Sequence, residues 1–175
     1  MKFARILFVF IVFAFAACNS KSEKNTKNIE KTKLQAFTDT VQLDTFKISL
    51  LGKNSKDMTL LFTITTNKGQ QVYKKEFKAD ELLKNYLASA DLKNEEEKVK
   101  FLNDEINFFF DEERFLIPAI TEQEKIDNNT PDIFFYKELK DSQLNGFNYR
   151  LGKEIKIYIA WSAKDKKVKI YYKCC

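Results

Sequence analysis

Four acidic residues beside an aromatic run are the first candidates for chemistry in this sequence. Glu105 precedes the run Phe108–Phe110, and Asp111, Glu112 and Glu113 follow it. A pair of carboxylates can hydrolyse a glycosidic bond, with one group as general acid and the other as nucleophile or base. The same arrangement suits a solvated hairpin end whose phenylalanines pack inside. We favour this structural interpretation, and no catalytic residue is predicted.

Histidine is absent from the whole chain of 175 residues. This excludes Ser-His-Asp and Cys-His nucleophile systems, His-ligated zinc and imidazole acid–base catalysis. The four glycines form no phosphate-binding loop, so no cofactor is predicted. Residues 127–132 supply oxygen atoms that a calcium ion accepts, but they lack the ligand spacing and the glycine of a calcium loop. An ordinary turn is expected there, and no metal site.

Adjacent cysteines, Cys174 and Cys175, end the sequence. In an oxidising compartment they could close a strained vicinal disulfide, which is the favoured role if they have one. They could also bond to another chain, bind a soft metal ion, or have no role. The sequence leaves these alternatives open.

Positive charge is modest, with a formal net charge of +5 and both signs interspersed, so nucleic-acid binding is not predicted. The final predicted hairpin nevertheless concentrates lysines. They could contact anionic glycans or lipid head groups, but lysine also protects strand edges from pairing, and we favour that role. These residues are Lys164, Lys166, Lys167, Lys169 and Lys173.

The N-terminal residues have the three parts of an export signal. Lys2 and Arg5 are followed by residues 6–17, which contain no polar side chain and are too few for a bilayer span of about 20 residues. Phe15-Ala16-Ala17-Cys18 resembles the lipobox of bacterial lipoproteins, with phenylalanine where leucine is usual. The resemblance implies cleavage before Cys18 and acylation of that cysteine, including palmitate.

Lipidation would attach the mature protein to a membrane without a spanning helix. Each buried CH₂ group contributes about 0.8 kcal/mol to the free energy of membrane binding, so several acyl chains keep the protein attached to the membrane. Residues 18–40 are almost entirely polar and are expected to form a flexible tether. Asp39-Thr40-Val41 resembles the acceptor motif of Bacteroidota O-glycosylation, which makes Thr40 a candidate modification site. We expect a location in the cell envelope, at the outer membrane, on a face that the sequence does not identify.

Hydrophobic periodicity then predicts the elements of the domain. Gly69 suits a hairpin turn, and Asn94 with Glu97 has the pattern of a helical capping box. Val168, Ile170 and Tyr172 are predicted to face inward together. The pattern predicts strands over residues 41–51, 57–66, 72–77, 106–110, 115–120, 133–136, 147–151, 154–161 and 167–173, and helices over residues 80–90 and 94–106.

Strands dominate this order, and no regular βαβ alternation occurs. We predict an α+β fold with a mainly antiparallel sheet or open barrel and a two-helix insertion. The organisation is a signal peptide (residues 1–17), a lipidated tether (18–40) and a single domain (41–175). The stretch beginning Val72-Tyr73-Lys74-Lys75-Glu76-Phe77 resembles small lipoprotein domains of Bacteroidota, a resemblance that implies no activity.

These observations favour a non-enzymatic envelope lipoprotein that binds a protein or a glycan. An inhibitor or chaperone-like module of the periplasm is an alternative that rests on fold analogy alone. A carboxylate-based glycan hydrolase is the third hypothesis, and it would depend on Glu105 or Glu113.

Overall fold

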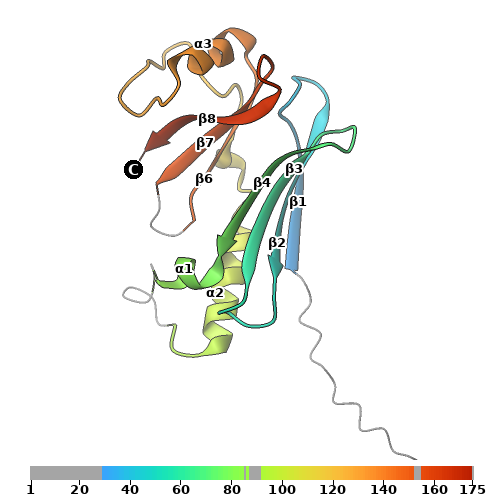
Figure 1. The fold of residues 1–175 in the computed structure, drawn as a ribbon, viewed down its shortest axis with the longest axis vertical. Helices are drawn as coiled ribbons and strands as arrows, with labels where there is room; N and C mark the ends of the chain where they lie inside the picture. Colours follow the sequence, from blue (N-terminus) through green and yellow to red (C-terminus); the bar gives the residue numbers. More distant parts are fainter. Residues whose placement is uncertain (1–28, 85, 87–91, 152–154, 175) are drawn as a thin grey trace, which may run out of the picture.

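The computed structural model of this chain describes residues 29–84, 86, 92–151 and 155–174. It contains two four-stranded antiparallel sheets with strand orders β1-β2-β3-β4 (sheet A) and β5-β6-β7-β8 (sheet B). Neither sheet closes into a barrel, so the predicted α+β class is confirmed, with two sheets where one was expected. Figure 1 shows sheet A beside helices α1 and α2, and sheet B beneath helix α3.

Sheet A is a meander of consecutive strands. Its strands are β1 (Ile29–Ala36), β2 (Leu43–Leu51), β3 (Thr59–Thr65) and β4 (Gln71–Lys78). The alternation in β2 and β3 buries Phe46 and Phe62 on the inner face, as predicted. Gly69 has φ +82° in the turn between β3 and β4, which confirms the predicted hairpin turn.

Strand β1 corrects the tether that was predicted for residues 18–40. Its Cα partners run from Ile29 with Leu50 to Ala36 with Leu43. The strand was missed because its half-buried positions include lysines instead of apolar residues. Lys31 donates from Nζ to the carbonyl oxygen of Asn107, so long side chains cover apolar surface while their ammonium groups bond at its edge.

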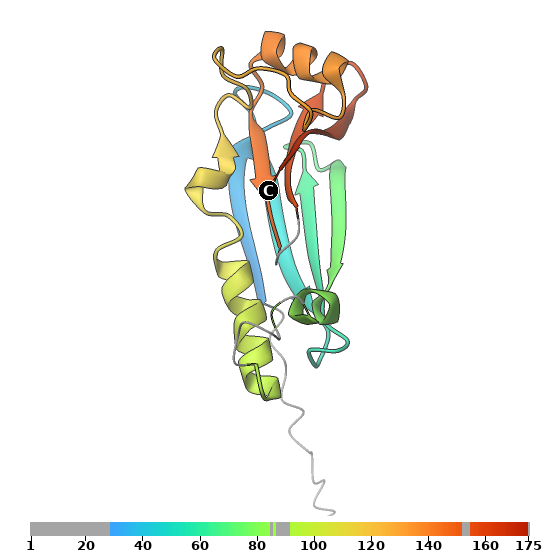
Figure 2. The ribbon, with the colours of Figure 1, turned by 90° about the vertical axis from the view of Figure 1, so that its left-hand side faces the viewer.

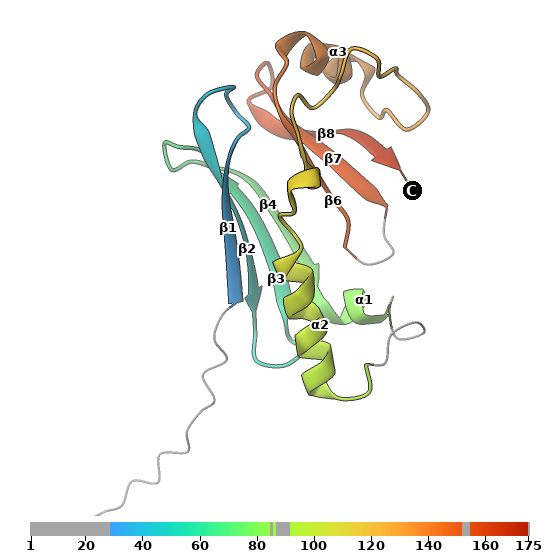
Figure 3. The same cartoon turned by 180° about the vertical axis from the view of Figure 1, so that it is seen from behind.

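Two helices follow sheet A. Helix α1 (Ala79–Lys84) is short, and the rest of the predicted helix falls mostly on residues that are not described. Helix α2 (Glu95–Asn107) begins at the predicted cap, where Asn94 accepts from the backbone N–H of Glu97 and the Glu97 side chain accepts in return. It packs along β1 and β2, and the chain then rises towards α3 (Figure 3). The strand predicted over residues 106–110 is wrong, because this helix and the turn after it occupy the segment.

The rest of the described chain forms sheet B and the helix that covers it. A 3₁₀ turn η1 (Glu112–Arg114) leads to β5 (Phe115–Leu116), and β6 (Gly146–Tyr149), β7 (Lys156–Ser162) and β8 (Lys167–Cys174) follow helix α3 (Ile133–Ser142). A strand predicted over residues 133–136 is wrong. Phe135, Tyr136 and Leu139 are buried on one face at helical spacing, and Asp132 caps the helix.

The main core lies between the two sheets and beside the end of α2. Phe62 contacts Phe46 on its own sheet, Phe109 after α2 and Phe147 on β6, with ring centroids 5.0–6.2 Å apart. Sheet B has a second buried face, which α3 covers at the upper end of the molecule (Figure 2). Sheet B is therefore the layer that separates a phenylalanine core from a smaller cluster under α3.

Candidate binding site

A pocket of about 300 Å³ lies on the face of sheet B that α3 covers, beside the loop that precedes α3. Four of its lining residues are tyrosines, and each combines an apolar ring with a polar hydroxyl. The pocket can therefore contact apolar and hydrogen-bonding groups of one ligand. It is lined by Leu116, Ile120, Glu124, Lys125, Tyr136, Tyr158, Tyr171 and Tyr172.

A β-bulge explains why two consecutive residues of β8 line the same pocket. In a regular strand Tyr171 and Tyr172 would point to opposite faces. Tyr158 pairs with Tyr172, whereas Ile159 pairs with Ile170, so Tyr171 is an extra residue in β8. A bulge re-aims side chains, and both tyrosines belong to the cluster under α3. The prediction that Tyr172 shares the inner face of Ile170 is wrong for this reason.

The ring of Tyr158 is steeply inclined to its two neighbours. Its plane makes angles of 71° with Tyr171 and 86° with Tyr172, at centroid distances of 6.0 and 5.4 Å. The ammonium group of Lys156 lies 5.5 Å from the centroid of the Tyr158 ring. The rings thus form walls at steep angles, and at least one of them attracts a cation within the protein itself.

The hydroxyl of Tyr158 lies 3.8 Å from Cys174 Sγ, and those of Tyr171 and Tyr172 form hydrogen bonds with the loop. Tyr171 donates to the carbonyl oxygen of Ala119 at 3.0 Å, and burial raises the pKa of Tyr171 well above its ordinary value. Tyr172 donates to Oδ2 of Asp127 at 2.8 Å. Both phenols are therefore neutral donors whose positions are set by the loop.

Tyr136 differs from these two residues. Only 4% of Tyr136 is exposed, yet its hydroxyl makes no hydrogen bond to any residue that the structure describes. Burial raises its pKa, and the negative charges of Glu124 and Asp127 raise it further. The hydroxyl itself is not a fully buried atom, so it is accessible from the pocket. It can therefore form a hydrogen bond with a ligand.

The loop that forms the rim is attached to α3. Lys140 donates from Nζ to the carbonyl oxygens of Glu122 at 2.8 Å and Glu124 at 3.2 Å. Oε2 of Glu124 accepts from the backbone N–H and the hydroxyl of Thr121, at 2.5 and 2.9 Å. These bonds organise the rim before any ligand binds, which lowers the entropic cost of binding.

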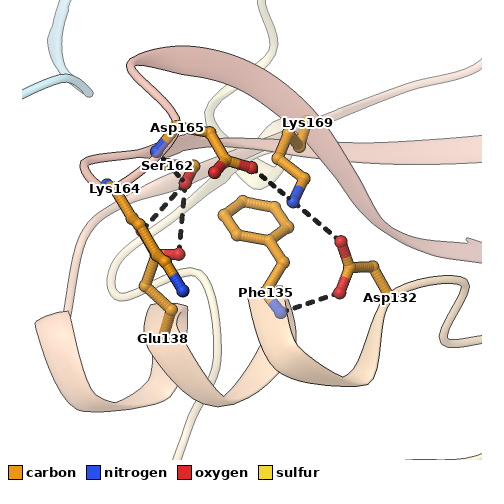
Figure 4. A network of polar contacts seen from close by, with 7 residues as sticks. All are labelled: Asp132, Phe135, Glu138, Ser162, Lys164, Asp165 and Lys169. Carbon is orange, nitrogen blue, oxygen red and sulfur yellow. Dashed lines mark hydrogen bonds and ion pairs between the residues drawn. The ribbon is translucent and has the colours of Figure 1, made fainter.

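An ion-pair network holds α3 against the hairpin of β7 and β8 (Figure 4). Lys169 Nζ lies 2.7 Å from Asp132 Oδ2 and 2.8 Å from Asp165 Oδ2, and 4.8 Å from the centroid of the Phe135 ring. Hydrogen bonding to Lys169 lowers the pKa of Asp132 and of Asp165. Asp132 also caps the helix, accepting from the N–H of Phe135 at 2.9 Å.

A second contact joins the same elements. Glu138 accepts from the hydroxyl of Ser162 at 2.9 Å and from the backbone N–H of Lys164 at 3.2 Å (Figure 4). Lys169 is therefore part of the attachment of α3, whereas the other lysines of the hairpin are exposed. These exposed residues are Lys164, Lys166, Lys167 and Lys173.

No family model, curated protein or solved structure matches this chain. The site is therefore interpreted from its own geometry.

The acids of the predicted carboxylate cluster lie on α2 and at η1. Glu105 is half-buried on α2, and burial raises its pKa. Asp111 directly precedes η1, Glu113 is exposed, and Glu112 forms an ion pair with Lys33 of β1. The hairpin end predicted here is wrong, but the phenylalanines Phe109 and Phe110 do pack inside.

The acids of residues 127–132 bond within the protein. Asp127 accepts from Tyr172 and, through Oδ1, from the backbone N–H of Asn129 at 2.8 Å. Asp132 caps α3 and forms an ion pair with Lys169. Among the described residues no group of three or more His, Cys, Asp or Glu side chains could hold a metal ion.

The predicted modification sites are only partly described. Thr40 is exposed in the connection between β1 and β2, where Asp39 Oδ1 accepts from the backbone N–H groups of Val41 and Gln42 at 2.7 and 3.0 Å. Asp39 thus organises the turn, and glycosylation of Thr40 stays a prediction. Cys18 lies outside the described residues, so its lipidation also stays a prediction.

Cys174 lies next to the tyrosine pocket. Cys174 ends β8 half-buried, and its Sγ is 3.8 Å from the hydroxyl of Tyr158. Cys175 is outside the described residues, so the disulfide stays a prediction. Across the residues that can be described, no helix combines the length and apolarity needed to cross a membrane.

Sequence reasoning missed the pocket. Its signals were the adjacent Tyr171 and Tyr172 opposite Tyr158, and the helical spacing of Tyr136 with Leu139. Neither signal reveals a shared pocket, because that depends on the bulge in β8 and on the position of α3.

Proposed function

We propose that this chain is a non-catalytic binding module of the cell envelope, anchored through acylated Cys18, and that it binds a sugar unit of a glycan in the tyrosine pocket. The observation that carries the proposal is the combination of four tyrosines with Glu124 and Lys125 in one pocket of about 300 Å³. Sugars have apolar C–H faces and polar hydroxyls, so they match walls that offer rings and hydrogen-bonding groups together.

The size of the pocket favours a glycan unit over a folded protein. Stable protein–protein interfaces bury about 800 Å² on each partner, whereas a concave site of a few hundred Å³ encloses a compact ligand. The rim is attached to α3 by Lys140, and Tyr171 and Tyr172 are held by hydrogen bonds. Such an organised site binds with little loss of side-chain freedom.

A binding screen tests the proposal. The full-length protein in detergent is titrated with a panel of envelope and dietary glycans, and binding is measured by calorimetry. Tyr172→Ala is expected to weaken binding at least tenfold, because it removes one wall of the pocket. Phe134→Ala is the matched control, since Phe134 is an aromatic residue of α3 that is 86% exposed and does not line the pocket. Absence of binding across the panel would overturn the proposal.

The anchor has its own test. Cys18→Ala is expected to move the protein from the membrane fraction to the soluble fraction of the envelope, because the acyl chains are lost. Protease treatment of intact cells then separates a surface location, where the domain is digested, from a periplasmic one. A Cys18→Ala protein that stays in the membrane fraction would contradict lipid anchoring.

One observation favours hydrolysis as a second candidate. Burial raises the pKa of Glu105, as expected for a general acid. Loss of a glycan-cleaving activity in Glu105→Gln and Glu113→Gln, with the fold intact, would support this candidate. No turnover across the same glycan panel would eliminate it.

A further inference from the structure

We propose that the sugar unit recognised by the pocket carries a free primary amine, so that the ligand is an amino sugar bound as its ammonium ion. This inference rests on the proposed glycan-binding function and specifies its ligand. Two acceptors with unused capacity, steeply inclined aromatic walls and the charges at the rim each point to a cationic N–H donor.

The first acceptor is the carboxylate of Glu124. Its Oε2 atom accepts from Thr121, whereas Oε1 accepts no hydrogen bond from any residue in the described ranges. The carboxylate is thus oriented through one oxygen and left available through the other. A charge-assisted bond from an ammonium group to such an oxygen is about twice as strong as a neutral one.

The second acceptor is the hydroxyl of Tyr136. This residue is 4% exposed and lines the pocket, and no described group bonds to its hydroxyl. The hydroxyl is not a fully buried atom, so it is accessible from the pocket. The phenol oxygen can therefore accept a hydrogen bond from a ligand N–H. An amino sugar would use a hydroxyl that the fold leaves open in this pocket.

The aromatic walls suit a cation. Tyr158 is inclined by 71° to Tyr171 and by 86° to Tyr172, so the three rings do not form a flat platform. The faces of aromatic rings attract ammonium groups. Lys156 places its own ammonium 5.5 Å from the Tyr158 centroid, within the range of a cation–π contact, without lining the pocket.

The charges around Tyr136 agree with this assignment. Glu124 and Asp127 both raise the pKa of Tyr136, so their negative charges act on the interior of the pocket. Lys125 also lines the pocket, and Glu124 and Lys125 are both exposed, so water and salt screen both charges. An ammonium group can pair with Glu124, whereas a neutral sugar cannot.

A matched series of oligosaccharides tests the inference on the full-length protein in detergent. The three probes share one linkage and differ at one position, which carries an amine (glucosamine), an acetamide (N-acetylglucosamine) or a hydroxyl (glucose). Calorimetry is expected to show that the amine form binds about tenfold more tightly than either neutral form. Equal affinity for the three probes would overturn this inference and leave the proposed glycan binding intact. Binding of none of them would overturn the amino-sugar assignment, and the wider glycan panel would then decide the proposed function.

Variants locate the effect. Glu124→Gln is expected to abolish the preference for the amine, so that the variant binds the three probes with similar affinities. Tyr136→Phe, which removes only the hydroxyl, is expected to reduce the preference severalfold. Glu122→Gln is the control, because Glu122 lies in the same loop and does not line the pocket. A preference for the amine that survives Glu124→Gln would overturn the amino-sugar assignment.

A lysine-containing peptide tests whether the ligand is a sugar. A peptide that binds as tightly as the amino sugar would overturn the assignment of a sugar as the ligand.

Discussion

The two hydrophobic clusters on either side of sheet B are built from different side chains. The cluster between the sheets consists mainly of phenylalanine and aliphatic residues, including Phe62 and Phe147, which are 0% exposed. The cluster under α3 is smaller and contains two buried phenols, Tyr136 and Tyr171. Phenylalanine packing needs no polar partner, whereas buried hydroxyls do. The first cluster also contains one buried phenol, Tyr149, whose hydroxyl lies 2.7 Å from that of Tyr73, so the two clusters differ in their proportion of polar side chains.

The largest expected effect tests the stability of the first cluster. Phe62→Ala is expected to lower the free energy of unfolding by about 3–5 kcal/mol, because it leaves a cavity among closely spaced rings. Urea denaturation of the full-length protein, followed by the fluorescence of its single tryptophan, measures the loss. Phe108→Ala is the control, since Phe108 is 59% exposed and its loss should be within about 0.5 kcal/mol. Equal losses in the two variants would contradict the contribution of Phe62 to the cluster between the sheets.

Gly146 tests the cluster under α3. An added Cβ at this position would lie 2.8 Å from Ala119 Cβ and 2.8 Å from the Tyr171 hydroxyl oxygen. Gly146→Ala is therefore expected to cost about 1–3 kcal/mol through overpacking and to disturb the bond from Tyr171 to Ala119. The same denaturation experiment measures the stability, and binding in the tyrosine pocket should weaken in parallel. A variant with lower stability and unchanged glycan binding would show that the position of Tyr171 does not matter for glycan binding.

The helix caps allow a direct comparison of the two regions. Asn94→Ala and Asp132→Ala each remove a side chain that accepts from a backbone N–H at the start of a helix, and each should cost about 1 kcal/mol. Asp132→Ala should cost more, because Asp132 also pairs with Lys169 at 2.7 Å. Asp132→Asn keeps the cap and removes the charge, so it isolates the ion pair. A larger loss in Asn94→Ala would show that the ion-pair network contributes little.

Local chemistry in the sequence predicted much of the first region. The capping box at Asn94 and the turn at Gly69 depend on residues a few positions apart, and both are confirmed. Alternation in β2 and β3 likewise identified buried faces that contain Phe46 and Phe62. Strand β1 was missed, because most of its positions carry polar side chains, such as Lys31, and its pairing with β2 is visible only in the fold.

The second region depends on relations that no local pattern contains. The bulge at Tyr171 reverses the alternation of β8, and it is visible only once β7 and β8 are paired. Helix α3 was hidden because a short apolar run fits a strand as well as a helix. The sequence therefore predicted residues such as Tyr172 as core, and only the pairing of the strands makes them walls of a pocket.

The smallest expected effect concerns Glu105, the acid whose environment most resembles the phenols under α3. Burial raises its pKa, the charge of Asp104 adds to the rise, and Arg114 opposes it. The folded state therefore binds the Glu105 proton more tightly than the unfolded state does, and this contribution to stability declines as the pH rises from the ordinary glutamate pKa to the raised one. Glu105→Gln removes the decline, so the variant should unfold at a higher temperature than the wild type at neutral pH and lose this advantage in acid. Thermal unfolding across a pH series measures the difference, with exposed Glu113→Gln as control. A Glu105→Gln protein that is less stable than the wild type at neutral pH would mean that the charge of Glu105, through its interaction with Arg114, stabilises the fold.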